Sequence, residues 1–107
     1  MKYRVLLVAA AERDLLDLHL FVERNDSPAR ADDLLTKIEQ AITSLGQMPE
    51  RGHAPPELAR LGIHDLREIH YKPYRIFYEI IGKEVVVHAV ADGRRDLRDL
   101  LAERLLR

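Results

Sequence analysis

The sequence predicts one α/β domain of the α+β type, in which a pair of antiparallel helices packs on one face of a four-stranded, mainly antiparallel sheet. Three observations lead to this expectation. Two segments carry apolar residues at helical spacing, and three later segments are rich in β-branched and aromatic residues. The length of 107 residues fits a single domain, residues 1–107, with a core of its own. The expected order is βααβββ, followed by a short C-terminal helix.

The chain begins with a strand and a helix. Residues 3–8 are β-prone and nearly all apolar, which is typical of a strand covered on both faces. A helix over about residues 10–24 places four apolar residues on one stripe: Ala11, Leu15, Leu18 and Val22. Leu16 and Leu20 lie four residues apart on nearly the opposite side. They are either tolerated surface leucines or a patch that binds a partner.

Turn residues bound the second helix. Ser27 is placed as its N-cap, Pro28 as its first residue, and Gly46 is expected to end it. Its apolar stripe is the cleanest in the chain: Ala31, Leu34, Leu35, Ile38, Ile42 and Leu45. Because the link between the two helices is short, we expect an antiparallel αα-hairpin.

The second half is expected to hold a loop, three strands and a last helix. Prolines and glycines over residues 48–65 predict a long loop with one helical turn near residues 57–61. The expected strands, joined by tight turns, are residues 66–71, 74–81 and 85–90. Asp96 and Asp99 are spaced like the N-cap and the third residue of a short helix.

Composition limits the classes of function. The formal net charge is −1, which does not indicate a nucleic-acid binder, and the basic residues concentrate in the second half. The absence of cysteine excludes disulfides, thiolate metal sites and a cysteine nucleophile, and it fits a cytoplasmic protein. The N-terminal apolar run is too short to cross a bilayer, so we expect a strand there, not a signal peptide, and no membrane association.

Neither a cofactor nor a metal is expected. The chain has no phosphate-binding glycine loop and no GxSxG turn, and its five histidines show no HxH or HxxxH spacing: His19, His53, His64, His70 and His88. His88 is expected to be structural. His70 lies near Arg75 across a predicted hairpin and is the better candidate for acid–base chemistry.

Arginines should gather at one end of the last hairpin. Arg75 begins its first strand, and Arg94 and Arg95 follow its second strand. An antiparallel hairpin brings these two points together, and clustered guanidinium groups suit phosphate or carboxylate recognition. The competing interpretation is that Arg75 pairs with Glu79 or Asp96 and only stabilises the fold.

The strand LREI, the strand PYRIFY and the closing DGRRDL, in a βααβββ order, together resemble the RelE/ParE superfamily of bacterial toxins and plasmid stabilisation proteins. The resemblance covers essentially the whole chain. It implies the cytoplasmic toxin of a type II toxin-antitoxin module, which inhibits growth and which a cognate antitoxin neutralises by wrapping around it in a hetero-oligomer. It also implies one of two activities. ParE-type toxins poison DNA gyrase, and RelE-type toxins are metal-independent ribonucleases that cleave messenger RNA on the ribosome.

Carried over by position, the RelE-type activity assigns catalytic roles to four residues. Arg75 and Arg95 would contact the scissile phosphate, Arg67 stands where these enzymes have a lysine, and His70 would substitute for a missing acid–base group.

Two departures count against that activity. Ile69 stands at the position of a second strand lysine, and Leu101 stands at that of a tyrosine. The ending of the chain is closer to the ParE type, which favours a gyrase poison. The residues expected to contact the target are then Arg94, Arg95, Asp96 and Arg98.

The antitoxin is expected to cover apolar groups without an evident intrachain partner: Leu16 and Leu20 on the first helix, and Leu97 and Leu101 on a terminal helix over residues 97–106. A non-catalytic protein-binding module that dimerises is the remaining alternative.

Overall fold

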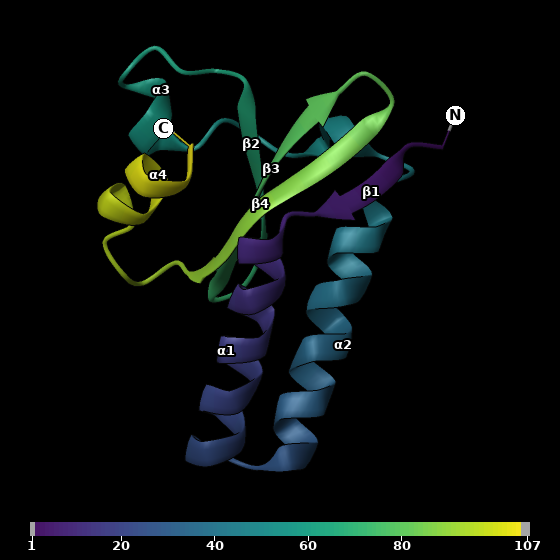
Figure 1. The fold of residues 1–107 in the computed structure, drawn as a ribbon, viewed down its shortest axis with the longest axis vertical. Coiled ribbons are helices and arrows are strands. Elements are labelled where there is room, and N and C mark those ends of the chain that lie inside the picture. Colours follow the sequence, from purple (N-terminus) through teal and green to yellow (C-terminus); the bar gives the residue numbers. More distant parts are fainter. Residues whose placement is uncertain (1, 106–107) are drawn as a thin grey trace.

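The computed structural model describes residues 2–105, and their elements follow the predicted order (Figure 1). The strands are β1 (Arg4–Leu7), β2 (Leu66–Tyr71), β3 (Tyr74–Ile81) and β4 (Glu84–Asp92). The helices are α1 (Ala9–Asn25), α2 (Pro28–Ser44), α3 (Pro56–Ala59) and α4 (Arg98–Leu105), with a 3₁₀ turn, η1 (Pro49–Arg51), before α3. Leu106, which was expected in the terminal helix, lies outside the described residues. Among the described helices, none is long and apolar enough to cross a membrane.

Two of the predicted helix boundaries have visible causes. The Ser27 hydroxyl accepts a hydrogen bond from the backbone N–H of Arg30 at 3.1 Å, and Pro28 opens α2, which confirms the predicted cap. At α4, the Asp96 carboxylate accepts from the backbone N–H of Arg98, the first helical residue, at 3.0 Å.

The sheet has the order β1-β4-β3-β2. β4 and β3 pair antiparallel, as do β3 and β2, whereas β1 is parallel to β4. The mainly antiparallel sheet with the αα-hairpin on one face is therefore confirmed. The register places His70 opposite Arg75 and Tyr74 opposite Asp92.

A bulge in β4 allows the sheet to bury both faces. Phe77 pairs with Ala89 and Tyr78 with Val87, so His88 is an extra residue on β4. Because side chains alternate along a strand, the extra residue turns Ala89 toward the face opposite Val87. The ring of His88 is held by Glu79, with 3.1 Å between Nε2 and Oε1.

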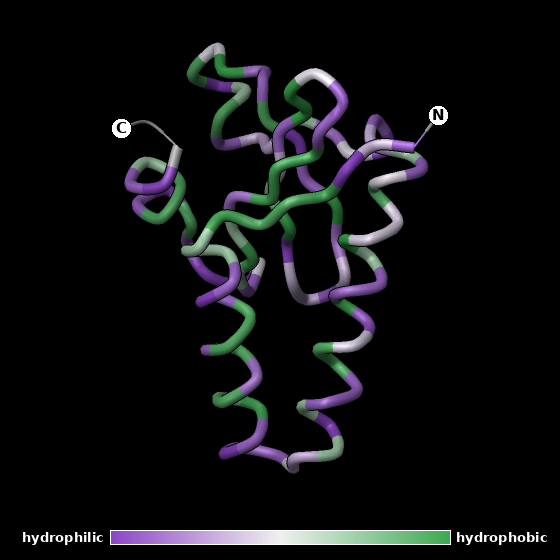
Figure 2. The backbone as a smooth tube through the Cα atoms, turned by 45° about the vertical axis from the view of Figure 1, so that its right-hand side comes forward, coloured by the Kyte–Doolittle hydropathy of each residue, from purple (hydrophilic) through white to green (hydrophobic). Residues whose placement is uncertain are grey.

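Each face has its own core. The larger core joins the sheet to α1 and α2, and the smaller one joins it to α3 and α4. Figure 2 shows the apolar character concentrated in the central strands, with alternating character along the helical hairpin. The smaller core contains Leu58, Leu66, Phe77, Ala89, Ala91, Leu97 and Leu101.

This second core corrects one sequence-based expectation. Leu97 and Leu101 were expected to lack intrachain partners, but each is only 1% exposed and packs in the smaller core. The bulge in β4 supplies their contact surface, because it directs Ala89 and Ala91 toward them. The premise for assigning these two leucines to an antitoxin surface is therefore wrong.

Candidate functional site

Arg75 lies at the centre of a closed ion-pair network on the α3 side of the sheet. Its Nε and Nη2 donate to the two carboxylate oxygens of Glu68 at 2.6 and 2.7 Å. Its Nη1 and Nη2 donate to Glu57 at 2.7 and 2.8 Å. The guanidinium also lies 4.9 Å from the centre of the Phe77 ring. Arg75 therefore ties β3 to both α3 and β2, and its partners are neither Glu79 nor Asp96.

The three groups of this network are ionised. Hydrogen bonds from Arg75 lower the pKa of Glu57 from 4.5 to about 2. Burial alone would raise the pKa of Glu68, but hydrogen bonds from Arg75 and His70 lower it below its usual value. The same carboxylates raise the pKa of Arg75. Two carboxylates therefore share one guanidinium, which leaves one net negative charge.

The arginines of the predicted cluster bind different partners. Arg94 donates through Nε and Nη2 to its own neighbour Asp92, at 3.0 and 2.6 Å, while Arg75 binds Glu57 and Glu68. Although β3–β4 pairing brings the two segments together, their guanidinium groups bind different carboxylates.

Two other arginines of the predicted site, Arg67 and Arg98, are held by hydrogen bonds and ion pairs of their own. Nη1 of Arg67 donates to the backbone carbonyls of Glu50 and Gly52 at 3.2 and 3.1 Å, which anchors the loop before α3. Arg98 pairs with Asp96 at 2.7 Å on the exposed surface at the start of α4.

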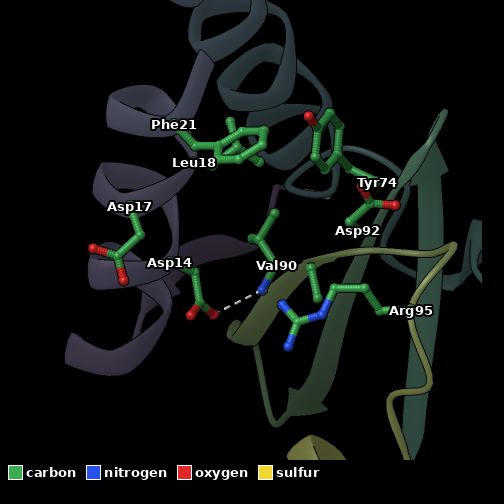
Figure 3. Close-up of a pocket in the computed structure, with 9 residues that line it drawn as sticks. Asp14, Asp17, Leu18, Phe21, Tyr74, Val90, Asp92 and Arg95 are labelled. Carbon is green, nitrogen blue, oxygen red and sulfur yellow. Dashed lines mark hydrogen bonds between the residues drawn. The ribbon is translucent and has the colours of Figure 1, made fainter. Parts of the chain in front are cut away.

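Arg95 lines a separate hollow of about 300 Å³ between α1 and the end of β4. In Figure 3, Phe21 and Leu18 lie together across from Tyr74, and Arg95 extends back toward Val90. Three carboxylates also line it: Asp14, Asp17 and Asp92.

The floor of this hollow is held in place by Asp14. Its carboxylate accepts from the backbone N–H of Val90 at 3.0 Å and pairs with Arg104 of α4 at 2.7 Å. Arg104 also donates to the backbone carbonyl of His88 at 3.2 Å. Strand β1 pairs with β4 only as far as Val87. Beyond that point, the side chains of Asp14 and Arg104 bond the backbone N–H of Val90 and the backbone carbonyl of His88.

An exposed apolar surface on α1 adjoins the hollow. Leu16, Leu20 and Phe21 are 57%, 36% and 65% exposed. The exposure of the two leucines agrees with the sequence pattern, and their binding to an antitoxin stays a prediction. Phe21 was missed, because at three residues from Leu18 it lies on the margin of the buried stripe.

His53, Glu68 and His70 form a cluster that sequence spacing did not predict. His70 Nε2 lies 2.7 Å from Glu68 Oε1, and His53 Nε2 lies 3.8 Å from Glu68 Oε2. Strand alternation was a usable signal for Glu68 and His70, which share a face of β2. His53 comes from the loop after η1, so nothing in the local sequence indicated that it would join them.

A family model described as "ParE toxin of type II toxin-antitoxin system, parDE" matches residues 5–97. No curated protein matches the sequence. Among solved structures, the chromosomal ParDE toxin-antitoxin system from P. aeruginosa is 16% identical, with a TM-score of 0.72 over 85% of this chain and 96% of that one.

Two other solved structures show the same fold. The toxin-antitoxin complex RelBE2 from Mycobacterium tuberculosis is 24% identical, with a TM-score of 0.62 over 86% of this chain and 92% of that one. A double arginine-to-alanine variant of the E. coli toxin RelE in the free state is 15% identical, with a TM-score of 0.65 over 99% and 97% of the two chains. Since the family model spans residues 5–97 of the 107, the chain belongs to the family of ParE toxins of type II toxin-antitoxin systems.

Proposed function

We propose that this protein is a ParE-like toxin that inhibits bacterial growth by poisoning DNA gyrase in the cytoplasm, and that a cognate antitoxin neutralises it. The observation that carries the choice of target is the bonding of Arg75. Four hydrogen bonds to Glu57 and Glu68 occupy four of its five N–H donors. An arginine bound in this way has no free edge for a bidentate contact with phosphate.

The other residues of the RelE-type assignment do not converge on one phosphate either. Arg67 donates to backbone carbonyls, and His70 is held by Glu68. Arg95 lines a different hollow from the one that contains Arg75 and His70. A phosphate near Arg75 would also meet the net negative charge of its two carboxylates, which disfavours RNA cleavage there.

The target surface of this proposal is the segment from β4 to α4. Arg94, Arg95, Asp96 and Arg98 are all exposed there. Arg94 and Arg98 are each paired with one neighbouring carboxylate at the surface, where water competes for both partners, so they can exchange that partner for a group on another protein.

The proposed antitoxin surface is the exposed side of α1 with Leu16, Leu20 and Phe21. Phe21 belongs both to this surface and to the hollow near Arg95. An apolar helix or strand with basic residues would fit, because Asp17 and Asp92 line the same hollow. The ParDE and RelBE2 structures are of toxin-antitoxin systems, which supports a partner of this class.

Induced expression without a partner tests the target. We expect growth arrest, gyrase-dependent DNA cleavage and intact RNA. Arg95→Ala should relieve the arrest, whereas Arg30→Ala, an exposed arginine at the start of α2, should not. Ribosome-dependent RNA cleavage with unaffected gyrase would replace this proposal by the RelE-type activity. Normal growth with the protein confirmed by immunoblot would favour a non-catalytic binding module.

A further inference from the structure

We propose that His53, Glu68 and His70 form a binding site for a divalent transition metal, with Zn²⁺ as the best-matched ion. The three residues each offer one ligand atom, and these atoms all lie within 4.8 Å of one another. Two imidazoles and one carboxylate are a ligand set that zinc uses in proteins, with a fourth position left for solvent or another group. This site is independent of the proposed gyrase and antitoxin surfaces.

The backbone holds the three residues in place before any ion binds. His53 and Glu68 form an isolated antiparallel bridge, with hydrogen bonds of 3.1 Å from His53 N–H and 2.7 Å from Glu68 N–H. Glu68 and His70 alternate on β2 and share one face. The two imidazole rings meet edge to face with 5.3 Å between their centres. Little ordering of the chain is therefore needed for binding.

The ligand atoms already lie near coordination distances. Both Nε2 atoms face the Glu68 carboxylate, at 2.7 Å for His70 and 3.8 Å for His53. Bonds of about 2.0–2.1 Å hold the ligand atoms of tetrahedral zinc about 3.3 Å apart. These two separations bracket that value, and the ligand atoms of all three residues lie within 4.8 Å of one another, so modest side-chain shifts would admit the ion.

The surroundings give the ion access and a fixed carboxylate. The imidazoles are 59% and 42% exposed, whereas the Glu68 side chain is 1% exposed. The three residues line a hollow of about 270 Å³ that can hold the fourth ligand. Arg75 binds both oxygens of Glu68, as the outer partners of metal-binding carboxylates do.

Charge and protonation are also compatible with a cation. Glu57 and Glu68 share the single charge of Arg75, which leaves one net negative charge beside the imidazoles. Arg51 lines the same hollow and Arg60 lines the adjoining one, but both side chains are exposed, so solvent screens their charges. Zinc would bind Nε2 of His70 in the tautomer that carries its proton on Nδ1.

The competing role for this cluster is purely structural, with both histidines only neutralising Glu68. His70→Gln separates the two roles, because a glutamine amide can still donate to Glu68 but is a poor zinc ligand. His53→Ala removes the second imidazole. His64→Ala is the matched control, since His64 is exposed and stands outside the cluster.

The experiment titrates the purified full chain, first freed of metal with a chelator, with Zn²⁺ by calorimetry and by thermal melting. We expect one zinc per chain, a raised melting temperature and visible absorption bands of a tetrahedral site when Co²⁺ replaces zinc. His53→Ala and His70→Gln should each weaken zinc binding at least tenfold and abolish the rise in melting temperature. His64→Ala should bind like the wild type.

Three results would count against the proposal. One is the absence of any zinc binding by the folded wild-type chain. A second is equal zinc binding by the wild type, His53→Ala and His70→Gln, which would place the ion elsewhere. Circular dichroism of the metal-free variants establishes that each one is folded. A variant that melts at a lower temperature without zinc, but shows the same zinc-induced rise, would also count against the site.

Discussion

Arg75 and Arg95 belong to the same end of the β3–β4 hairpin, yet the structure uses them in different ways. On the α3 side of the sheet, Arg75 is 13% exposed and bound by two carboxylates. On the α1 side, Arg95 is exposed and lines an open hollow beside Phe21 and Tyr74. The difference comes from α3 and β2, which place Glu57 and Glu68 beside Arg75. Arg75 is therefore held by carboxylates of the fold, whereas Arg95 is accessible to a partner.

The largest effect expected from this comparison is on stability. Arg75→Ala would leave the buried Glu68 carboxylate without its main partner and would release α3 from β3. Breaking a buried pair by removing one partner typically costs about 3–5 kcal/mol. The free energy of unfolding, measured by urea titration, should fall by that amount.

Arg95→Ala is the control within the same hairpin. Its side chain is exposed, so the unfolding midpoint should stay close to that of the wild type. If Arg75→Ala were as stable as the wild type but no longer toxic, Arg75 would be a functional residue. The proposed difference in role between Arg75 and Arg95 would then be wrong.

A second effect concerns acid. The pKa of Glu57 is lowered to about 2 in the folded chain from 4.5. The stability that this provides is complete above pH 4.5 and is lost as the pH falls toward 2. At 1.36 kcal/mol per pKa unit, the contribution is at most about 3 kcal/mol.

Glu57→Gln isolates this contribution. Because glutamine does not titrate, the loss of stability between pH 5 and 3 should be shallower in the variant than in the wild type when both are unfolded by urea. Parallel curves for the two proteins would show that Glu57 is not the group responsible.

The next effect is on antitoxin binding at the exposed side of α1. Leu16→Asp with Leu20→Asp places charges on a surface that the proposal assigns to an apolar partner, so the affinity for the antitoxin should fall at least tenfold. Calorimetry of the complex measures this. Met48→Asp is the control, because Met48 is also apolar and 62% exposed but lies outside α1. Equal affinity for all three proteins would remove α1 from the interface.

The two faces of the sheet also differ in how far their structure could be predicted from the sequence. The alternation of strands and the helical stripes of α1 and α2 are local signals, and they predicted the order and the boundaries of β2 and β3. The bulge at His88 is not encoded by such a signal, and the two alanines that follow it, Ala89 and Ala91, share a core with Leu97 and Leu101.

The candidate site shows the same limit. The pairing of His70 with Arg75 follows from a two-residue turn, so their proximity was predictable. His53 and the short helix α3 with Glu57 reach the same region from a segment rich in proline and glycine, whose path is set by tertiary contacts. The sequence therefore identified Arg75 and His70 but not the carboxylates and the imidazole that determine what they can bind.

The smallest effect on stability, and the sharpest test of function, is expected for Arg94→Ala combined with Arg98→Ala. Both side chains are exposed, and among the described residues they pair only with carboxylates two residues away, Asp92 and Asp96. Their removal should leave the melting temperature unchanged within error, because ion pairs exposed to water contribute little to stability. Under the proposed function, the same variant should lose toxicity and gyrase-dependent DNA cleavage, because these guanidinium groups contact the target. Lys83→Ala, in the turn between β3 and β4, should change neither property. A double variant that melts normally and remains fully toxic would show that the basic segment after β4 is not the target surface.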